Sequence, residues 1–398
     1  MTETKKNRPA LLLLEDKKYF KGIFIDDPPQ KDHIGEIVFN TSMAGYQEII
    51  TDPSYKKQIV VFTYPSIGNY GYNKEDYESD KPYLEGIILK DYCEMPSNFR
   101  SQGTLKSFLK QYSLPAVAGI DTRALVRYIR EKGAMRAGIF EWPAGENTIS
   151  EKNLDKYINK VLSHSKMEGQ NLTEDFNGTL VNEYIEKRIK ENKINIKNYT
   201  KVAVLDFGIK YSIINNFLEA GILPIVFKGS SSYNTWENFN SNDYKGFFLS
   251  NGPGDPASVT TGIKNIEYLL TLKKPIFGIC LGHQMLSIAL GGKTYKLKFG
   301  HHGGNQPVKT KSVEKSKVLI TAQNHGFASD IESIKKIIDK TQNELKEEIN
   351  PNDNTFEGFF INNENYRLLS VQYHPEAGPG PHDALYLFKT YKDLLDKT

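Results

Sequence analysis

The feature that most constrains the fold of this chain is an alternation of short apolar runs and amphipathic segments across residues 201–292. The pattern predicts strands at 202–205, 223–227, 246–249 and 275–279, and helices at 211–219, 263–272 and 281–290. Gly291 and Gly292 follow the last predicted helix, as is typical of a helix end. Strands that alternate with helices favour an α/β fold with a doubly wound, mainly parallel sheet. Such sheets bind ligands beyond the carboxyl ends of their strands.

The length of 398 residues predicts more than one domain. A charged, apolar-poor stretch, VNEYIEKRIKENKINIKNYT, precedes the first predicted strand, so we place an N-terminal domain at residues 1–195 and a C-terminal domain at residues 196–398. The N-terminal half is predicted to be a smaller mixed α/β domain. It has strands within EIVFNTSM and QIVVFTYP, a turn at Asp52-Pro53-Ser54, and a helix, TRALVRYIREK, between Asp121 and Gly133.

Composition excludes several classes of protein. The 51 Lys and Arg residues nearly balance 48 Asp and Glu residues, which argues against a nucleic-acid or membrane-surface binder. The only cysteines are Cys93 and Cys280, too few for a disulfide framework or a cysteine-type zinc site. The apolar run Leu11 to Leu14 is too short for a signal peptide, and no run is long enough to span a membrane. We therefore expect a soluble, cytoplasmic protein.

One of the two cysteines lies in FGICLGHQ, where the predicted strand 275–279 meets the predicted helix 281–290. The small residues of G-x-C-x-G allow the strained strand-to-helix turn that presents a nucleophile. The helix that follows Cys280 favours the thiolate and offers N–H groups that can stabilise an oxyanion. An inert core cysteine is the alternative, and this stretch alone does not decide between them.

A second stretch, RLLSVQYHPE, supplies what a nucleophilic cysteine needs: a base and a group that orients the base. Residues i and i+2 of an extended segment share a face, so His374 and Glu376 can lie side by side. We predict Cys280 as nucleophile, His374 as base and then acid, and Glu376 as the group that orients the imidazole. The turn SNGPGDP exposes glycine N–H groups that suit an oxyanion hole, although an ordinary Gly-Pro turn is the alternative.

FGICLGHQ, SNGPGDP and YHPE together resemble the motifs of class I glutamine amidotransferases, over residues from about 200 to 398. KFGHHGGNQPV, TAQNHGFA and HPEAGPGPHDA resemble one branch of that family, the small, glutamine-hydrolysing subunits of carbamoyl-phosphate synthetase. VFNTSMAGYQEIITDPSY, TYPSIGNYG, SNFR and GIDTRALVRYIREKGA in the N-terminal half resemble the same branch. The resemblance therefore covers nearly the whole chain, apart from residues 1–9 and the region near 140–200.

The resemblance implies roles for individual residues. It implies Cys280, His374 and Glu376 as the catalytic triad. It implies that the amides of Leu281 and Gly252 hold the oxyanion, with Gly254 in the same turn. The implied binders of L-glutamine are Ser54, Gln284, Asn324, Gly326 and Phe327. We expect no metal, because His301 and His302 lie beside Gly303 and Gly304 without a visible cluster of ligands.

The resemblance also implies a function. Glutamine is hydrolysed through a cysteinyl thioester, and the ammonia is delivered to a large subunit that makes carbamoyl phosphate from bicarbonate and ATP, for arginine or pyrimidine biosynthesis. No G-x-x-x-x-G-K-[ST] segment is present, so we expect no cofactor in this chain and place ATP and Mg on the partner. We expect a heterodimer or a larger assembly of heterodimers, and the basic helix at 122–132 faces either the partner or solvent.

Three alternatives remain open. The chain could supply ammonia to a different synthase, although its N-terminal half argues against that. It could be a catalytically inactive regulatory subunit, although the intact Cys280, His374 and Glu376 argue against that. It could also be an unrelated cysteine hydrolase of the same fold, which would need no partner.

Overall fold

A computed structural model describes residues 8–310, 317–338 and 346–397 of the chain. Contacts divide the chain into an N-terminal unit, residues 1–77 and 81–167, and a C-terminal unit, residues 78–80 and 168–398. This boundary lies before the predicted one near residue 195. The reason is that the charged helix α5 (Thr179–Glu191) buries Val181 and Ile185 in the core of the C-terminal unit.

The N-terminal unit is built around a closed barrel with the strand order β1-β2-β8-β6-β4-β3-β9. A mixed α/β domain was predicted, but not the closure of its sheet. Two short strands, β5 and β7, pair separately. The elements are β1 (Pro9–Leu14), β2 (Tyr19–Phe24), β3 (His33–Asn40), α1 (Tyr46–Thr51), β4 (Gln58–Phe62), β5 (Ser66–Ile67), β6 (Gly86–Ile88), β7 (Asp91–Tyr92), α2 (Leu105–Gln111), β8 (Ala116–Ala118), α3 (Thr122–Lys132), β9 (Met135–Glu141) and α4 (Glu151–Ser163).

The C-terminal unit contains a nine-stranded sheet with the order β11-β10-β12-β13-β18-β17-β16-β14-β15. The first five strands in this order are parallel, and the others are antiparallel. After α5 the elements are β10 (Thr200–Asp206), α6 (Tyr211–Glu219), β11 (Ile222–Lys228), β12 (Gly246–Leu249), α7 (Thr260–Thr271), β13 (Ile276–Ile279), α8 (Leu281–Ala289), β14 (Thr294–Thr310), β15 (Lys317–Ser329), α9 (Ile331–Ile338), β16 (Lys346–Ile349), β17 (Phe356–Asn362), β18 (Arg367–Val371) and α10 (Tyr386–Asp396).

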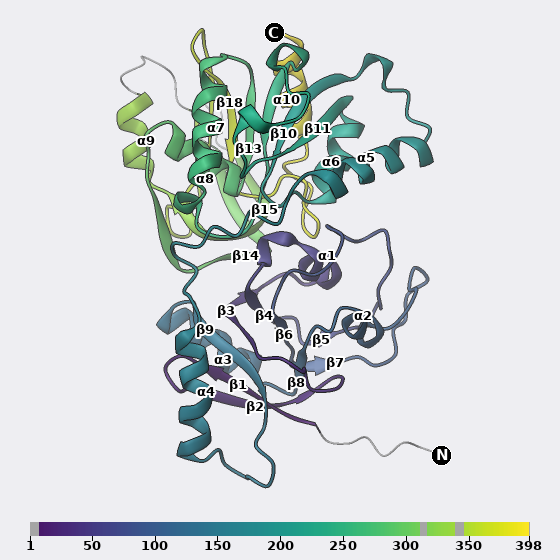
Figure 1. The fold of residues 1–398 in the computed structure, drawn as a ribbon, viewed down its shortest axis with the longest axis vertical. Coiled ribbons are helices and arrows are strands. Elements are labelled where there is room, and N and C mark those ends of the chain that lie inside the picture. The colour runs from purple at the N-terminus through teal and green to yellow at the C-terminus, as the bar shows by residue number, and fades with distance from the viewer. Residues whose placement is uncertain (1–7, 311–316, 339–345, 398) are drawn as a thin grey trace. The chain divides into compact units, whose positions relative to one another are not determined.

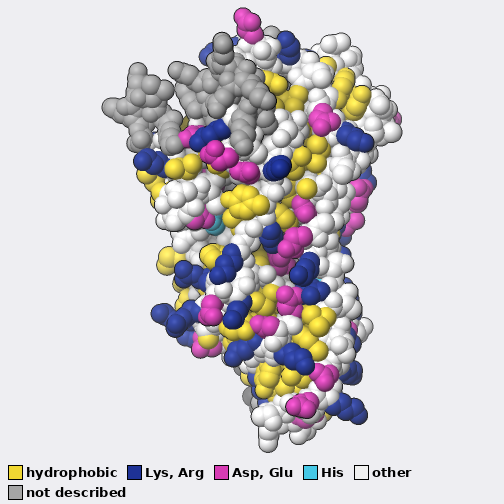
Figure 2. Space-filling model, turned by 90° about the vertical axis from the view of Figure 1, so that its left-hand side faces the viewer, with side chains coloured by type: hydrophobic (Ala, Val, Ile, Leu, Met, Phe, Trp, Pro, Cys, Tyr) yellow, Lys and Arg dark blue, Asp and Glu magenta, His cyan; other side chains and the backbone are white. Residues whose placement is uncertain are grey.

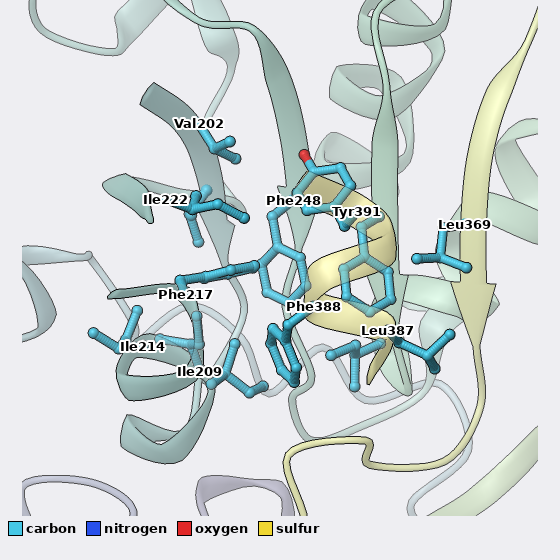
Figure 3. Close-up of a cluster of buried hydrophobic side chains, with 14 of the residues drawn as sticks. Val202, Ile209, Ile214, Phe217, Ile222, Phe248, Leu369, Leu387, Phe388 and Tyr391 are labelled. Atoms are coloured by element: carbon cyan, nitrogen blue, oxygen red, sulfur yellow. The ribbon is translucent and has the colours of Figure 1, made fainter. Parts of the chain in front are cut away.

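Helices cover both faces of the parallel part of this sheet (Figure 1). Alternate residues of β10 show the two faces: Val202 and Val204 pack with α5, α6 and α10, whereas Ala203 and Leu205 pack with α7 and α8. On the first face, Phe217 of α6 and Phe388 of α10 meet edge to face, with ring centroids 5.4 Å apart (Figure 3). The predicted doubly wound, mainly parallel sheet is therefore confirmed, with an antiparallel extension.

The surface agrees with the balanced composition. On the face shown in Figure 2, acidic and basic side chains are intermixed. In the described part of the chain, no helix combines the length and apolar character that crossing a membrane requires.

Candidate active site

Cys280 lies at the sharp turn between β13 and α8, where its backbone has φ 53° and ψ −105°. A non-glycine residue seldom adopts a positive φ, and it does so only where the surrounding structure enforces it. The two flanking glycines show why they are required. A Cβ atom on Gly282 would lie 2.2 Å from the carbonyl oxygen of Leu249, and one on Gly278 would lie 3.0 Å from the carbonyl carbon of Gly282.

The side chain of Cys280 is buried, with 2% of its surface exposed. Its Sγ lies 3.5 Å from the carbonyl oxygen of Asn324 on β15. Cys280 is the residue before the first turn of α8, so it lies at the end of the helix that carries free N–H groups and a partial positive charge. This is the setting that the sequence predicted for a nucleophile.

His374 and Glu376 follow the carboxyl end of β18 and lie side by side, as their spacing predicts. The Nδ1 atom of His374 donates a hydrogen bond to Oε1 of Glu376, at 2.6 Å. The backbone N–H of His374 donates to the carbonyl oxygen of Ala322, at 2.8 Å, which fixes the segment against β15. The second ring nitrogen, Nε2, is buried and has no hydrogen-bond partner among the described residues. It is therefore the nitrogen left to accept or donate a proton in a reaction.

Lys210 is the member of this site that sequence reasoning missed. Its Nζ donates to Oε1 of Glu376, at 3.0 Å, and to the carbonyl oxygen of Ala377, at 2.7 Å. The side chain is almost fully buried, and Lys seldom is unless it is paired. The available signal was its position: a lysine between the predicted strand 202–205 and the predicted helix 211–219, at the ligand-binding edge of the sheet.

Charges determine the protonation of the pair. Burial alone lowers the pKa of His374, but the charge of Glu376 and the neighbouring Cys280 outweigh it and raise that pKa to about 10. Burial alone raises the pKa of Glu376, but Lys210 and His374 outweigh it and lower that pKa to about 2. At neutral pH the site therefore holds a charged imidazolium between a carboxylate and a cysteine.

A buried carboxyl group, Glu78, adjoins this ion pair. Its Oε2 accepts hydrogen bonds from the backbone N–H and the hydroxyl of Ser212, at 3.1 and 2.7 Å, at the first turn of α6. Burial raises the pKa of Glu78 to about 7, against the opposing effects of Lys210 and of the bonds from Ser212. Glu78 is separated in sequence from the rest of the C-terminal unit, which begins at Glu168, and nothing in its local pattern indicated this position.

The raised pKa of Glu78 predicts a pH dependence of stability. Between about pH 4.5 and about pH 7 the folded state holds a proton that the unfolded state has lost, so stability should fall as pH rises through this range. We expect the free energy of unfolding of the wild type to fall by on the order of 3 kcal/mol over this range, and Glu78→Gln to lack this fall. Urea unfolding of the wild type and the variant at pH 5 and pH 8 measures the difference. Parallel pH profiles would contradict the assignment.

The turn SNGPGDP follows β12 at the same sheet edge. The Ser250 hydroxyl accepts from the Phe207 N–H, at 2.8 Å, and donates to the Asn251 carbonyl, at 2.7 Å. A Cβ atom on Gly252 would lie 2.2 Å from the carbonyl oxygen of Phe207, and Gly254 has φ +98°. Both glycines are therefore required by the backbone. The oxyanion roles of the Gly252 and Leu281 amides stay predictions.

The structure brings together four of the five predicted glutamine binders. Gln284 is buried on α8, and its Nε2 donates to the Phe327 carbonyl, at 2.7 Å. Asn324, Gly326 and Phe327 lie in succession on β15, beside Cys280. Ser54 lies in the N-terminal unit, where its N–H donates to Asp52 Oδ1, at 2.8 Å. The contacts of these residues with glutamine stay predictions.

Two further histidines contact the strands that carry the predicted binders. His302 Nδ1 lies 2.8 Å from Asn324 Oδ1, and His325 Nδ1 lies 2.7 Å from the carbonyl oxygen of Phe327. Carbonyl and amide oxygens are acceptors, so both Nδ1 atoms carry a proton. Burial lowers the pKa of His302 to about 3 and that of His325 well below its usual value, so both rings are neutral. His283 does not contact these binders in the same way: its Nδ1 lies 2.8 Å from the hydroxyl oxygen of Ser370, on β18.

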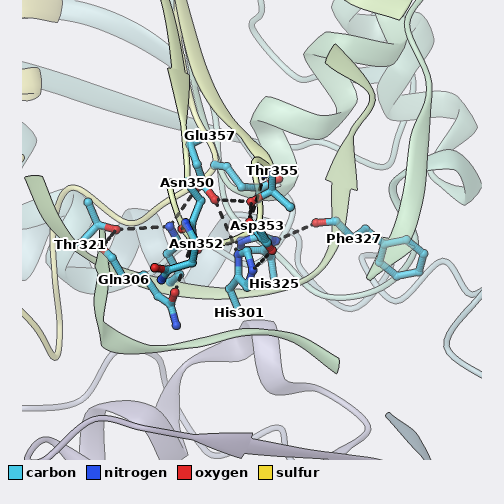
Figure 4. A network of polar contacts seen from close by, with 12 residues as sticks. His301, Gln306, Thr321, His325, Phe327, Asn350, Asn352, Asp353, Thr355 and Glu357 are labelled. Atoms are coloured by element: carbon cyan, nitrogen blue, oxygen red, sulfur yellow. Dashed lines mark hydrogen bonds and ion pairs between the residues drawn. The ribbon is translucent and has the colours of Figure 1, made fainter. Parts of the chain in front are cut away.

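A cluster of polar groups, most of them buried, surrounds His301 (Figure 4). Its Nε2 lies 2.8 Å from Asp353 Oδ2, and its Nδ1 lies 3.6 Å from Glu357 Oε1. Burial alone lowers the pKa of His301, but these carboxyl groups outweigh it and raise that pKa to about 9. His301 is therefore positively charged at neutral pH and pairs with Asp353.

Ligand atoms of His301, His325 and Glu357 lie within 4.8 Å of one another, a spacing that could hold a metal ion. The expectation that no ligand cluster exists near His301 was wrong, because the sheet brings β14, β15 and β17 together from separate parts of the sequence. The same side chains are engaged in the ion pair and hydrogen bonds described above. The absence of a metal stays a prediction.

A doubly wound sheet that places a cysteine turn and a His–Glu pair at the carboxyl ends of adjacent strands, β13 and β18, defines the class of protein. This combination places the protein in the class I glutamine amidotransferases. The family model described as glutamine amidotransferase class-I matches residues 203–394, and the model described as carbamoyl-phosphate synthase small chain, CPSase domain, matches residues 12–139.

Relatives narrow the class to one family. The carbamoyl phosphate synthase small chain of Thermosynechococcus vestitus is 44% identical over 388 residues, 96% of this chain and 94% of the relative. That of Syntrophotalea carbinolica is 44% identical over 98% of both chains, and that of Aquifex aeolicus is 43% identical over 96% of this chain and 98% of its own. The chain belongs to the carbamoyl-phosphate synthase small-chain family.

Proposed function

We propose that this chain hydrolyses L-glutamine to glutamate and ammonia, as the glutaminase subunit of a carbamoyl-phosphate synthase. The observation that carries the proposal is the ordered set Lys210–Glu376–His374, which holds a charged imidazolium at the sheet edge where Cys280 occupies its strained turn. Family membership supports the same activity.

The first half of the reaction is thioester formation. The Cys280 thiolate attacks the carboxamide carbon of glutamine, and the carbonyl oxygen becomes an oxyanion held by the amides of Leu281 and Gly252. His374 gives its Nε2 proton to the nitrogen, which leaves as ammonia, and a γ-glutamyl thioester remains on Cys280. Each preorganised oxyanion donor is worth about 3–4 kcal/mol of barrier reduction.

The second half regenerates the enzyme. His374, now neutral, takes a proton from water, and the resulting hydroxide attacks the thioester carbon. The C–S bond breaks, glutamate leaves, and the thiolate and imidazolium are restored. Glu376 keeps Nδ1 protonated throughout, so that Nε2 is the nitrogen that exchanges the proton.

Substrate recognition is assigned to residues around Cys280. Asn324, Gly326 and Phe327 bind the amino-acid end of glutamine, and Gln284 contacts the substrate. Ser54 is kept as a further binder on the family resemblance alone. His302 and His325 orient the binders on β15 through the Asn324 side chain and the Phe327 carbonyl. The backbone carbonyls and amides of β15 suit a zwitterionic amino acid, which needs acceptors for its ammonium group and donors for its carboxylate.

The ammonia is consumed by a partner. The chain assembles with a large synthase chain that binds ATP and Mg and activates bicarbonate, in the cytoplasm, and delivers ammonia to it. The names of the curated relatives, small chains of carbamoyl phosphate synthase, support such a partner. No cofactor is assigned to this chain.

A glutamine-analogue diazoketone tests the proposal directly. We expect it to add one equivalent of label to Cys280, as located by peptide mass spectrometry, and glutamine to slow the labelling. Cys93 provides an internal control, because it is the only other cysteine and lies in the N-terminal unit. Label on both cysteines at equal rates, or on neither, would contradict a dedicated nucleophile and favour a regulatory role.

A further inference from the structure

A cationic cavity of about 590 Å³ lies in the N-terminal unit, on the surface of α3. Arg123, Arg127 and Arg130 contribute from successive turns of that helix, and Lys90 contributes from the segment between β6 and β7. None of the described residues that line the cavity is acidic. The remaining lining residues are Thr63, Pro65, Thr122 and Val126.

The four cations of this cavity differ from three other basic side chains of the same unit, which are paired. Arg8 pairs with Asp27, Arg136 with Glu15 and Lys160 with Asp32, each with an N–O distance of 2.6 Å. Within residues 8–310, 317–338 and 346–397, no carboxylate forms an ion pair with any of the four. Four neighbouring like charges repel one another, and an arriving anion relieves this repulsion.

Arginine is the side chain best suited to bind carboxylates here. Its planar guanidinium forms two parallel hydrogen bonds to one carboxylate, and it is more weakly hydrated than an ammonium group. Three such groups at intervals of four and three residues face one cavity, with the hydroxyl-bearing Thr63 and Thr122 beside them. This arrangement can receive more than one acidic side chain at a time.

The segment that continues the chain from Lys90 favours a protein ligand over a small ion. Pro65 and Lys90 lead directly into β5 and β7, which pair with each other. The segment after β7 exposes 83% of Met95 and 96% of Phe99. Protein interfaces are enriched in Arg, Met and aromatic residues and depleted in acidic ones, which matches this surface.

We propose that this cavity, with the segment that follows β7, is the docking surface for an acidic segment of the large synthase chain. The inference rests on the proposed function, because it takes its partner from there. Carboxylates of the partner enter the cavity and pair with Arg123, Arg127, Arg130 and Lys90. Apolar side chains of the partner cover Met95 and Phe99.

The test is the affinity of this full-length chain for the large chain. We expect Arg123→Glu with Arg127→Glu to weaken binding by at least about 10-fold, and the loss to shrink at high salt. Lys152→Glu with Lys156→Glu is the matched control, because it makes the same charge change on the exposed face of α4 and should leave affinity within about 2-fold. The neutral pair Arg123→Gln with Arg127→Gln should show a smaller loss in the same direction.

The outcomes separate this proposal from the proposed function. Labelling of Cys280 by the diazoketone in the isolated chain should be unchanged in every variant, so loss of glutaminase chemistry would be a separate failure. Unchanged affinity in the Arg123 and Arg127 variants, or equal weakening by the Lys152 and Lys156 control, would overturn the docking surface. Binding of inorganic phosphate that these arginine variants abolish, without any change in affinity for the large chain, would also overturn it.

Discussion

Cys280→Ser is expected to lower glutamine-dependent carbamoyl phosphate synthesis by at least about 10³-fold in the complex with the large chain. Serine is almost the same size as cysteine and fits the turn, but its hydroxyl remains protonated beside a charged His374 and is a poor nucleophile there. Synthesis from added ammonium salt should stay within about 2-fold of the wild-type rate, since ammonia bypasses the thioester. Both rates are measured on one preparation of the complex.

The paired rates make the outcome unambiguous. Cys93→Ser, which changes the other cysteine, should leave both rates unaltered. Loss of both rates in Cys280→Ser would mean that the complex itself is damaged, and the assignment of Cys280 as the nucleophile would not stand. Retention of the glutamine-dependent rate would contradict that assignment directly.

The sequence was informative where local pattern determines structure. The alternation across residues 201–292 predicted the parallel sheet, and the helices at Tyr211–Glu219 and Thr122–Lys132 have the predicted bounds. The i and i+2 spacing placed His374 beside Glu376, which the hydrogen bond of 2.6 Å confirms. These successes share a cause: strand alternation, helix caps and glycine-flanked turns act over a few residues.

The features that were missed depend on contacts between distant parts of the chain. Lys210 reaches Glu376, 166 residues away, only because β10 and β18 belong to one sheet, and Glu78 reaches Ser212 across 134 residues. The pairing of His301 with Asp353 and Glu357 depends on the antiparallel extension of that sheet. A buried charge needs a partner, but sequence alone does not reveal which residue the fold will bring to it.

The glycines that flank Cys280 are required because neighbouring backbone atoms leave no space for a side chain. Gly282→Ala should place a Cβ atom 2.2 Å from the carbonyl oxygen and 2.6 Å from the carbonyl carbon of Leu249. These are backbone atoms of β12, so they cannot move aside as a flexible side chain would. We expect a loss of about 3 kcal/mol in the stability of the C-terminal unit. Because α8 must move, we also expect a fall of about 100-fold in glutamine hydrolysis and in the rate of Cys280 labelling.

Substitutions at two other glycines distinguish the effect of steric contact from the effect of backbone strain. Gly221 has φ +73°, and a Cβ atom added there would approach Lys392 Cε no closer than 3.8 Å. Gly221→Ala should therefore cost about 1 kcal/mol and leave hydrolysis unchanged. Gly278→Ala, where the closest approach is 3.0 Å, should fall between the two. Hydrolysis assayed well below each melting temperature checks the order, because α8 then remains folded and only its position differs. If Gly282→Ala hydrolysed glutamine as fast as Gly221→Ala, the close packing of α8 against β12 would not be what holds Cys280 in its reactive turn.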